Sequence, residues 1–424
     1  MKEGGNEGVA TLKELLYSDE DLNRPMTIDE LKSILSSTIK RDDPTKVILF
    51  LGMLNTFTDE NQMNIALGSG SSTGKTYIAL ETAAYFPEEA VKIIGGATAR
   101  SFHHETGTWD EKRKAIVVDL EGKILILLDQ PDYQLMNNLR TFLSHDQKEI
   151  TYKITDKNDK HGLRTKTVIL RGYPTVVFCT TRGNPDEQEQ TRFIMLSPSI
   201  EEEKIAEAIL LQAEKLSDRD AYVKKLEVDP RRNWLRKRIR VIQLAGIRDV
   251  VIKDAKAIYE RFRKEHAHLV PRHQRDFPRL MTIIKAHAML NTFSHEKLDD
   301  GRIVATQEDI DAGFKLYGEV SEPNELGLSP EQYNLFKKVI ESLWNELHRG
   351  LTRQEVRDAY YRVHHRPLQE EKFRRDILPA LESSGLIYQE PDPDNRNRIL
   401  IHLPEKNQPK IPVIIQARFE TAGA

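Results

Sequence analysis

Residues 66–87 read ALGSGSSTGKTYIALETAAYFP, so a lysine and a threonine follow directly on a turn rich in glycine and serine. An apolar run ends at Gly68 and a helical pattern begins at Lys75, which places this turn between a strand and a helix. Backbone amides at the N-terminus of a helix bind phosphate oxygens, aided by the helix dipole. These residue types in this order predict a binding site for a nucleotide phosphate.

The turn follows the phosphate-loop pattern G-x-x-x-x-G-K-[ST] with one departure, because Ser69 stands at the first glycine position. We expect Lys75 to reach the β- and γ-phosphates of ATP and the Thr76 hydroxyl to bind Mg²⁺. The alternative is a flexible turn that happens to precede the letters GKT. The residues expected to bind the nucleotide are Gly70, Ser71, Ser72, Thr73, Gly74, Lys75, Thr76 and Tyr77.

A second magnesium ligand is expected at the end of a neighbouring buried strand. The segment KILILLDQPD, residues 123–132, supplies five apolar residues in succession and then Asp129. Asp129 is therefore predicted to be the Walker B carboxylate, although an aspartate at the end of a strand is often an ordinary turn residue.

Gln130 follows Asp129, where many ATPases of this class carry a glutamate that polarises the attacking water. An amide can orient water but cannot accept its proton. Three explanations stay open. Hydrolysis is slow, another acid such as Asp132 or Glu149 serves as the base, or the glutamine was introduced to trap ATP.

Composition limits the class of protein. The chain has 424 residues, of which 39% are hydrophobic and 30% charged, with a formal net charge of −3. This length allows two or three domains, since single cores rarely grow past about 250–300 residues. One cysteine, Cys179, excludes an internal disulfide framework and fits a reducing cytosol.

No apolar run approaches the roughly 20 residues of a membrane span, and the N-terminus does not resemble a signal peptide, so we expect a cytoplasmic protein without a membrane partner.

Segments of strand and helix character alternate before residue 200, which predicts an α/β fold with a parallel sheet. Later residues are charged and helical in period, with no convincing strand, until a compact C-terminal unit of three helices and a hairpin. The predicted strands are Val91–Ile94, Lys123–Leu128, Ile150–Lys153, Val168–Leu170 and Thr175–Thr181. The predicted divisions are an N-terminal helical segment (1–58), an ATPase core (59–199), a helical lid (200–320), a linker (321–329), the C-terminal unit (330–404) and a tail (405–424).

Four later segments, taken in order, resemble one family. They are KEITYKITDKNDKHGLRTKTVILRGYPTVVFCTT (148–181), EQTRFIMLSPS (189–199), RDFPRLMTIIKAHAMLN (275–291) and IVATQEDIDAGFKLY (303–317). Over roughly residues 60–404 the chain resembles the AAA+ ATPases with a hairpin before the sensor-1 strand. It is most similar to the minichromosome maintenance (MCM) replicative helicases, with the viral superfamily 3 helicases as more distant cousins.

The resemblance implies roles for several residues. Thr191-Arg192-Phe193 matches the MCM-type S-R-F motif, which makes Arg192 the arginine finger that reaches the nucleotide of a neighbouring subunit. Arg275 resembles sensor 2, although Pro278 stands where the family has a glutamate, and Arg279 is the second candidate. Sensor 1 falls on Thr180 or Thr181, where the family usually has asparagine. Arg192 could instead belong to a surface ion pair, and Arg275 could lie on the solvated face of a charged helix.

In the resembled helicases the hairpin points into a central channel and grips the DNA backbone. Lys157, Lys160 and Arg164 lie at or near its tip here, and lysine–phosphate contacts need no base reading. A solvated hairpin whose lysines prevent edge pairing is the alternative. The run RRNWLRKRIR (231–240) has six basic residues in ten and is equally compatible with a DNA contact or a contact between subunits.

The C-terminal unit is similar to a winged helix, a module that binds either DNA or protein. The first hypothesis for the whole chain is an ATP-driven, hexameric ring helicase or translocase of a prokaryotic, mobile-element or viral replication system, with DNA, other copies of the chain, and a primase or other replication proteins as partners. The second hypothesis is a slowly hydrolysing switch or loader that binds DNA.

Overall fold

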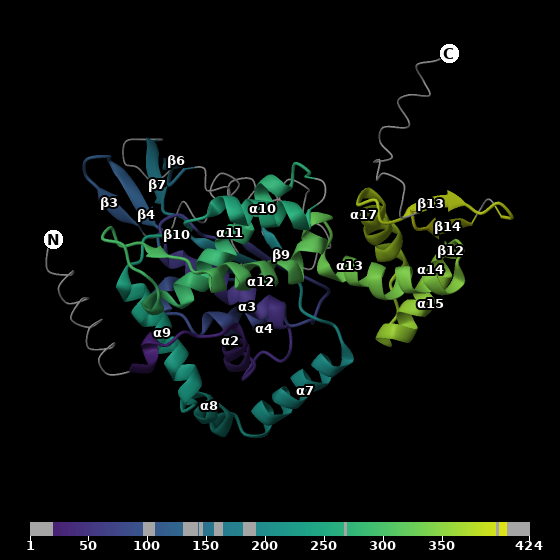
Figure 1. Ribbon diagram of the computed structural model, residues 1–424, viewed down its shortest axis with the longest axis horizontal. Helices are drawn as coiled ribbons and strands as arrows, with labels where there is room; N and C mark the ends of the chain where they lie inside the picture. The colour runs from purple at the N-terminus through teal and green to yellow at the C-terminus, as the bar shows by residue number, and fades with distance from the viewer. Residues whose placement is uncertain are drawn as a thin grey trace, which may run out of the picture.

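The computed structural model describes residues 20–95, 107–129, 143, 147–156, 164–180, 192–266, 269–395 and 398–404. The fold is a mixed α/β architecture with a parallel core sheet, surrounding helices and a small C-terminal antiparallel sheet (Figure 1).

The strands are β1 (Ile65–Gly68), β2 (Val91–Ile94), β3 (Thr108–Asp110), β4 (Ala115–Asp119), β5 (Ile124–Leu127), β6 (Glu149–Asp156), β7 (Arg164–Arg171), β8 (Thr175–Thr180), β9 (Ile194–Leu196), β10 (Val250–Val251), β11 (Ile303–Val304), β12 (Leu351–Thr352), β13 (Tyr388–Pro391) and β14 (Ile399–His402). The helices are α2 (Ile28–Leu35), α3 (Asp43–Leu54), α4 (Lys75–Ala83), α7 (Glu202–Ser217), α8 (Arg219–Glu227), α9 (Pro230–Ala245), α10 (Ala255–Glu265), α11 (His273–Leu290), α12 (Gln307–Glu325), α13 (Pro330–Leu335), α14 (Ser342–Leu347), α15 (Arg353–His364), α16 (Glu370–Lys372) and α17 (Leu378–Ser383). Two π-helical segments, η6 (Phe336–Glu341) and η7 (Phe373–Ile377), continue α13 and α16.

The core sheet has five parallel strands in the order β2-β5-β8-β1-β9. Every residue of β1, β5, β8 and β9 is buried, which explains why these strands read as continuous apolar runs in the sequence. The expected parallel α/β fold is confirmed.

The two faces of the sheet bury alternate residues, as the period of a strand requires. Ile65 and Leu67 of β1 join a core that also contains residues of α2, α3, α9, α11 and α12. Ala66 points the other way and joins a second core shared with the four-stranded sheet. The N-terminal helices α2 and α3 are therefore an integral part of the main core.

The hairpin β6–β7 belongs to a separate sheet with the order β3-β4-β7-β6. β3–β4 and β6–β7 are antiparallel, whereas β4 and β7 pair in parallel. β4 leads into β5 and β7 leads into β8, so this sheet continues from the N-terminal edge of the core sheet and lies at the upper left of Figure 1.

The C-terminal unit has its own hydrophobic core, built around Phe336, Ile340, Phe373 and Leu381. Its strands form an antiparallel sheet with the order β12-β14-β13, on the right of Figure 1. The three helices and the hairpin expected in this region are present.

Several details differ from expectation. The region after residue 200 contains one short parallel pair, β10 with β11, which the sequence analysis missed because each strand has only two residues.

α12 continues through Pro323 to Glu325, so most of the expected linker 321–329 is helical. The buried Asn324 side chain explains this extension. Its amide accepts a hydrogen bond from the Met195 amide (2.9 Å) and donates to the Met195 carbonyl (3.0 Å), which covers the free edge of β9.

One buried ion pair connects the N-terminal segment, the phosphate loop and the helical region. Lys204 Nζ lies 2.5 Å from a carboxylate oxygen of Asp42 and donates to the carbonyls of Ser199 (3.0 Å) and Thr73 (3.2 Å). Both charged residues are buried. Burial raises the pKa of Asp42, against the opposing effect of the Lys204 cation.

We predict that Lys204→Ala lowers the free energy of unfolding by about 3–5 kcal/mol, because it leaves the Asp42 carboxylate buried without its cation. Combining Asp42→Asn with Lys204→Met should cost less than the two single changes together. Urea unfolding measures both effects, with Lys215→Ala on the exposed surface of α7 as the control. A loss for Lys204→Ala no larger than the control's would contradict this account.

Candidate nucleotide-binding site

The loop between β1 and α4 folds back on itself through its own hydroxyl groups. Ser69 Oγ donates to Thr73 Oγ1 (2.8 Å), which in turn donates to the Gly70 carbonyl (3.1 Å). Gly74, directly before α4, has φ of 90°, in the left-handed region that favours glycine. This backbone angle explains the glycine at position 74, whereas Ser69 is not among the described residues with positive φ, so serine is accepted there.

Lys75 is buried at the start of α4, and its ammonium donates to the carbonyls of Ser69 (2.9 Å) and Gly70 (2.6 Å). Burial lowers the pKa of Lys75 below its usual range. The cation is thus held by neutral acceptors in a partly desolvated position. An anionic phosphate would be a stronger partner, since charge-assisted hydrogen bonds exceed neutral ones.

Parallel register brings the other predicted groups to the edge of the sheet that carries this loop. Thr180, the last residue of β8, pairs with Gly68, and its carbonyl accepts a hydrogen bond from the Ser69 amide (3.3 Å). Asp129 follows β5, which pairs in parallel with β8, and is exposed. Ligands of open parallel sheets bind at the carboxyl ends of the strands.

The environment of the buried Cys179 thiol supports this convergence. Burial raises the pKa of Cys179, the Thr76 hydroxyl and the Lys75 cation oppose the rise, and the Asp129 carboxylate adds to it. All three predicted groups are thus within electrostatic reach of one thiol. A hydroxyl and a carboxylate are hard oxygen ligands, so Thr76 and Asp129 fit the needs of Mg²⁺.

Arg192 lies at the opposite edge of the sheet. It precedes β9, whose first residue Ile194 pairs with Ile65 at the start of β1, whereas the phosphate loop follows the end of β1. Four residues of extended strand separate these ends by roughly 10–13 Å. The backbone of Arg192 therefore lies at the end of the sheet opposite the phosphate loop of its own chain.

The two candidates for sensor 2 differ in environment. Arg275 is exposed on α11. Arg279 is buried, donates to the Phe193 carbonyl (2.6 Å), and pairs with the fully buried Asp276 (2.7 Å). Arg279 therefore fixes the backbone next to Arg192, and only 8% of its surface is exposed.

Several expected site residues lie outside the described part of the chain, namely Gln130, Thr181, Lys157 and Lys160. Arg164 is described only as the first residue of β7, where it pairs with Asp156.

Glu149, one of the alternative water-activating acids, lies on β6 of the four-stranded sheet and not on the core sheet that carries the phosphate loop. It pairs with Arg171 at the far edge of the sheet, and its carboxylate lies 2.8 Å from the Arg113 guanidinium.

The basic run 231–240 forms much of α9, and two of its arginines are internal. Arg232 donates to the Tyr85 hydroxyl (2.9 Å), and Arg238 donates to the carbonyls of Leu290 (2.9 Å) and Leu22 (2.9 Å). Burial lowers the pKa of Arg238 to about 10. The dense basic patch expected from the sequence is therefore partly a structural element that binds carbonyl oxygens.

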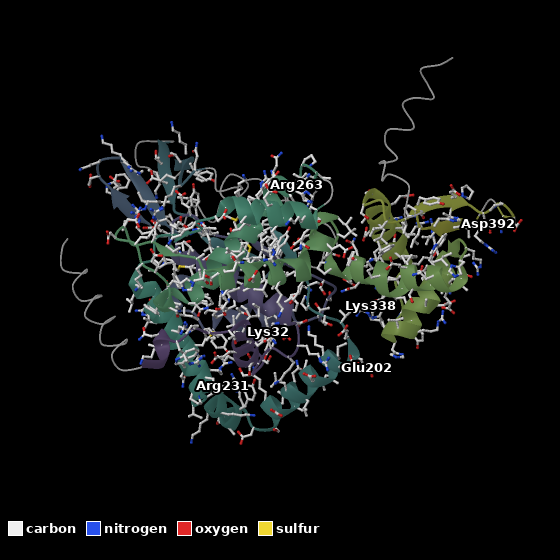
Figure 2. The ribbon with its side chains drawn as sticks, viewed as in Figure 1. Lys32, Glu202, Arg231, Arg263, Lys338 and Asp392 are labelled. Carbon is white, nitrogen blue, oxygen red and sulfur yellow. The ribbon has the colours of Figure 1, made fainter. Side chains whose placement is uncertain are left out.

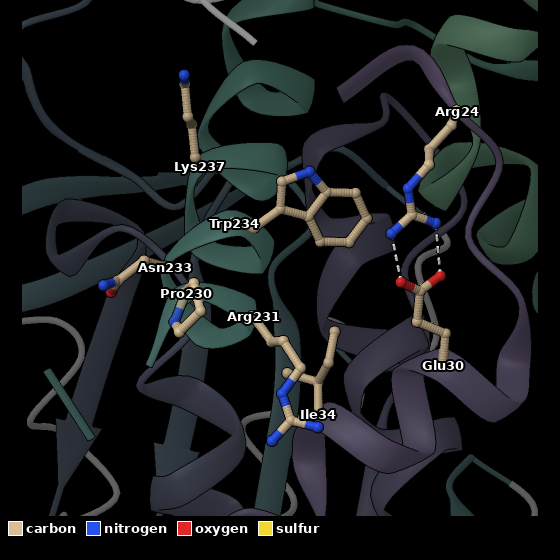
Figure 3. A pocket seen from close by; sticks show the side chains of 8 residues that line it. All are labelled: Arg24, Glu30, Ile34, Pro230, Arg231, Asn233, Trp234 and Lys237. Carbon is tan, nitrogen blue, oxygen red and sulfur yellow. Dashed lines mark hydrogen bonds and ion pairs between the residues drawn. The ribbon is translucent and has the colours of Figure 1, made fainter. Parts of the chain in front are cut away.

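The exposed side of α9 borders a surface hollow of about 520 Å³ (Figure 3). The Arg24 guanidinium pairs with Glu30 beside it and lies 4.6 Å from the Trp234 ring centroid. Arg231 and Lys237 are the members of the basic run that line this hollow, so contact with DNA or another subunit stays a prediction for these two. The lining residues are Arg24, Glu30, Ile34, Pro230, Arg231, Asn233, Trp234 and Lys237.

A cluster of His266, His273 and Glu325 was also missed, since its members come from three separate helical regions. Their ligand atoms lie within 4.8 Å of one another. His273 Nδ1 accepts the Val270 amide (3.1 Å), which leaves the proton of a neutral ring on Nε2, the atom facing Glu325. A metal ion would need an unprotonated Nε2 on His273. These contacts therefore favour a hydrogen-bonded cluster over a metal site. Burial acts to lower the pKa of His266, but hydrogen bonds to the Phe262 carbonyl and Glu325 outweigh it and raise the pKa.

The sequence analysis also missed two residues that contact the phosphate loop. One is Lys204, described above, and the other is Glu331 of α13, whose carboxylate accepts a hydrogen bond from the Gly70 amide (3.2 Å). Locally, Glu331 lies in a capping box formed by Ser329 and Gln332. That pattern indicates only a helix start, so no local signal reveals the contact.

No family model and no curated protein matches the chain. Among solved structures it is similar to a full-length MCM homolog from Methanopyrus kandleri, at 12% identity over 74% of this chain and 61% of that one, with a TM-score of 0.43. It is also similar to the active helicase Cch of SCCmec type IV, at 11% identity over 90% and 71% of the two chains, TM-score 0.32. A third is the C-terminal region of NrS-1, at 11% identity over 90% and 79%, TM-score 0.26.

This chain therefore spans about three-fifths of the MCM homolog (61%). Likenesses this distant assign no role to any residue. Within the described residues, no helix is long and apolar enough to cross a membrane.

The contrast between the two arginines of α11 predicts separable effects. Arg279→Ala should lower the free energy of unfolding by about 3–5 kcal/mol, because the buried Asp276 loses a guanidinium partner. Arg275→Ala should change it by less than about 0.5 kcal/mol, as expected for an exposed position, and the resemblance of Arg275 to sensor 2 predicts that this change slows ATP hydrolysis. Thermal unfolding and phosphate release measure the two effects. Equal destabilisation by both changes would contradict the assignment.

Proposed function

We propose that this chain is an ATP-dependent motor that assembles into a ring and moves DNA, as a helicase or translocase. The observation that carries the proposal is that the predicted site residues lie at opposite ends of the strands of the core sheet. The phosphate loop, Thr180 and Asp129 meet at one edge, and Arg192 lies at the other. A chain built in this way completes its site with the arginine of a neighbour.

Each residue has a defined task in this scheme. The loop amides and Lys75 bind the phosphate oxygens, and Thr76 with Asp129 holds the magnesium ion, which neutralises charge on the phosphates. The Thr180 hydroxyl orients the attacking water. Arg192 of the adjacent subunit stabilises the charge that develops on the transferred phosphoryl group, so that hydrolysis depends on assembly.

The DNA-binding part rests on the hairpin β6–β7. Its sheet continues from the N-terminal edge of the core sheet, and the sequence between its two strands contains Lys157 and Lys160. Contacts from lysine to phosphate do not depend on base sequence, which suits movement over any DNA. The C-terminal unit has the helix and strand content of a winged helix and is a second candidate for contact with DNA or protein.

A second candidate function is a DNA-binding switch or loader that hydrolyses ATP slowly. Gln130 favours it, because the position after Asp129 lacks a group that can accept a proton. The two functions differ in turnover: a motor couples many ATP molecules to continuous strand separation, whereas a switch stays bound after one.

Lys75→Ala should weaken binding of a fluorescent ATP analogue by about one to two orders of magnitude, since charged hydrogen bonds contribute about 1.5–3 kcal/mol. The matched control is Lys256→Ala, an exposed lysine of α10. Unaltered binding by the Lys75 variant would rule out the phosphate-loop assignment.

Subunit mixing tests the shared site. Arg192→Ala and Lys75→Ala should each abolish hydrolysis, the former by about a thousandfold or more. A mixture should recover activity, because some interfaces then combine an intact phosphate loop with an intact arginine. Absence of recovery, with ring formation intact, would show that Arg192 does not act on a neighbour's nucleotide.

The double change Lys157→Ala with Lys160→Ala should spare ATP binding and stop strand separation. It should also lower the slope of log affinity for DNA against log salt by about one to two, because up to two phosphate contacts are lost. Lys112→Ala with Lys114→Ala, in another turn of the same sheet, is the control. If the hairpin variant unwinds DNA normally, the two lysines are not the residues that hold the DNA backbone during unwinding.

A further inference from the structure

The C-terminal unit places a carboxylate on the phosphate loop of its own chain. Glu331 of α13 accepts the hydrogen bond of the Gly70 amide at 3.2 Å, across 261 positions of sequence. An anionic oxygen on a phosphate-loop amide occupies the kind of position that a phosphate oxygen takes. The neighbouring Lys75 senses the same carboxylate, which acts to raise its pKa against burial.

Two cations of the C-terminal unit surround the same carboxylate. Lys372 Nζ lies 3.5 Å from Glu331 Oε1, and a guanidinium nitrogen of Arg366 lies 3.6 Å from it. The other oxygen, Oε2, is the one that meets Gly70. A single carboxylate thus bridges the loop and two positive charges, as one phosphate group does in sites built from amides and basic side chains.

The C-terminal unit also contacts the main body away from the loop. Lys338 of η6 lies 2.6 Å from the Glu201 carboxylate, next to Glu202 at the start of α7 (Figure 2). His365 Nε2 lies 3.9 Å from Glu202. At the other side, Asn324 holds the end of α12 against β9. These contacts join the C-terminal unit to the main body at points other than Glu331.

We propose that Lys372 and Arg366 are phosphate-binding residues of the nucleotide site, and that the Glu331 carboxylate holds the phosphate position until nucleotide replaces it. The inference rests on the proposed nucleotide site. An arriving phosphate repels the carboxylate and takes over its three partners, namely the Gly70 amide and the two cations. The contacts of the C-terminal unit then depend on whether nucleotide is bound to its own subunit.

The test is binding of a non-hydrolysable ATP analogue with Mg²⁺ to the full chain, measured by titration calorimetry. Glu331→Gln should tighten binding about three- to tenfold, because the competing charge is removed. Lys372→Ala combined with Arg366→Ala should weaken binding about tenfold or more, in line with lost charged hydrogen bonds. Glu341→Gln, which removes a carboxylate of η6 paired with Lys337, is the control and should have no effect.

A third variant separates phosphate binding from mere support of Glu331. In the Glu331→Gln background, Lys372→Ala should still weaken binding by about the same factor as it does in the otherwise unaltered chain. If its effect disappears there, Lys372 serves only to hold Glu331, and the proposal fails for that residue. If Glu331→Gln binds no more tightly than Glu341→Gln, the carboxylate does not compete. Thermal unfolding of each variant confirms that it is folded.

The outcomes also separate this proposal from the one on which it rests. If the unaltered chain binds no nucleotide, or Lys75→Ala binds as well as the unaltered chain, the nucleotide site itself is wrong. If Lys75→Ala abolishes binding while the Glu331, Lys372 and Arg366 variants equal the control, the nucleotide site stands and the role of the C-terminal unit is refuted.

Discussion

The parallel register of β1 with β8 and β9 is the constraint on which the rest of the molecule depends. Because the strands run in one direction, their carboxyl ends meet at one edge and their amino ends at the other. The first edge gathers Thr180 and Asp129 beside the phosphate loop, and the second carries Arg192. Burial of the strands on both faces keeps this separation rigid, since every side chain of β1 packs in a core.

Much of the charge in the chain supports this framework. Arg232, Arg238, Arg279 and Lys204 are buried, and each donates to backbone carbonyls or hydroxyls that join distant segments. Charged residues make up 30% of this chain, and some of its cations thus hold distant segments together inside the protein. For this reason the local density of charge in the sequence was a poor guide to which basic residues are exposed.

The sequence predicted what short patterns encode. The phosphate loop, the strand before Asp129 and the parallel sheet follow from local spacing, and the structure contains the sheet and brings the loop and Asp129 together. Contacts across long separations could not be read in this way. Glu331 lies in an ordinary capping box, and Asn324 follows a proline that indicated a linker. Their partners, Gly70 and Met195, are set by packing of whole units, which no local pattern specifies.

The grip of Asn324 on Met195 links the last helix of the main body to the strand that begins just after Arg192. Only Leu326–Ser329 separate that helix from α13, where Glu331 meets the loop. The C-terminal unit is therefore attached to the main body beside the strand that follows Arg192, so the Glu331 contact and the backbone next to Arg192 belong to one connected set of contacts.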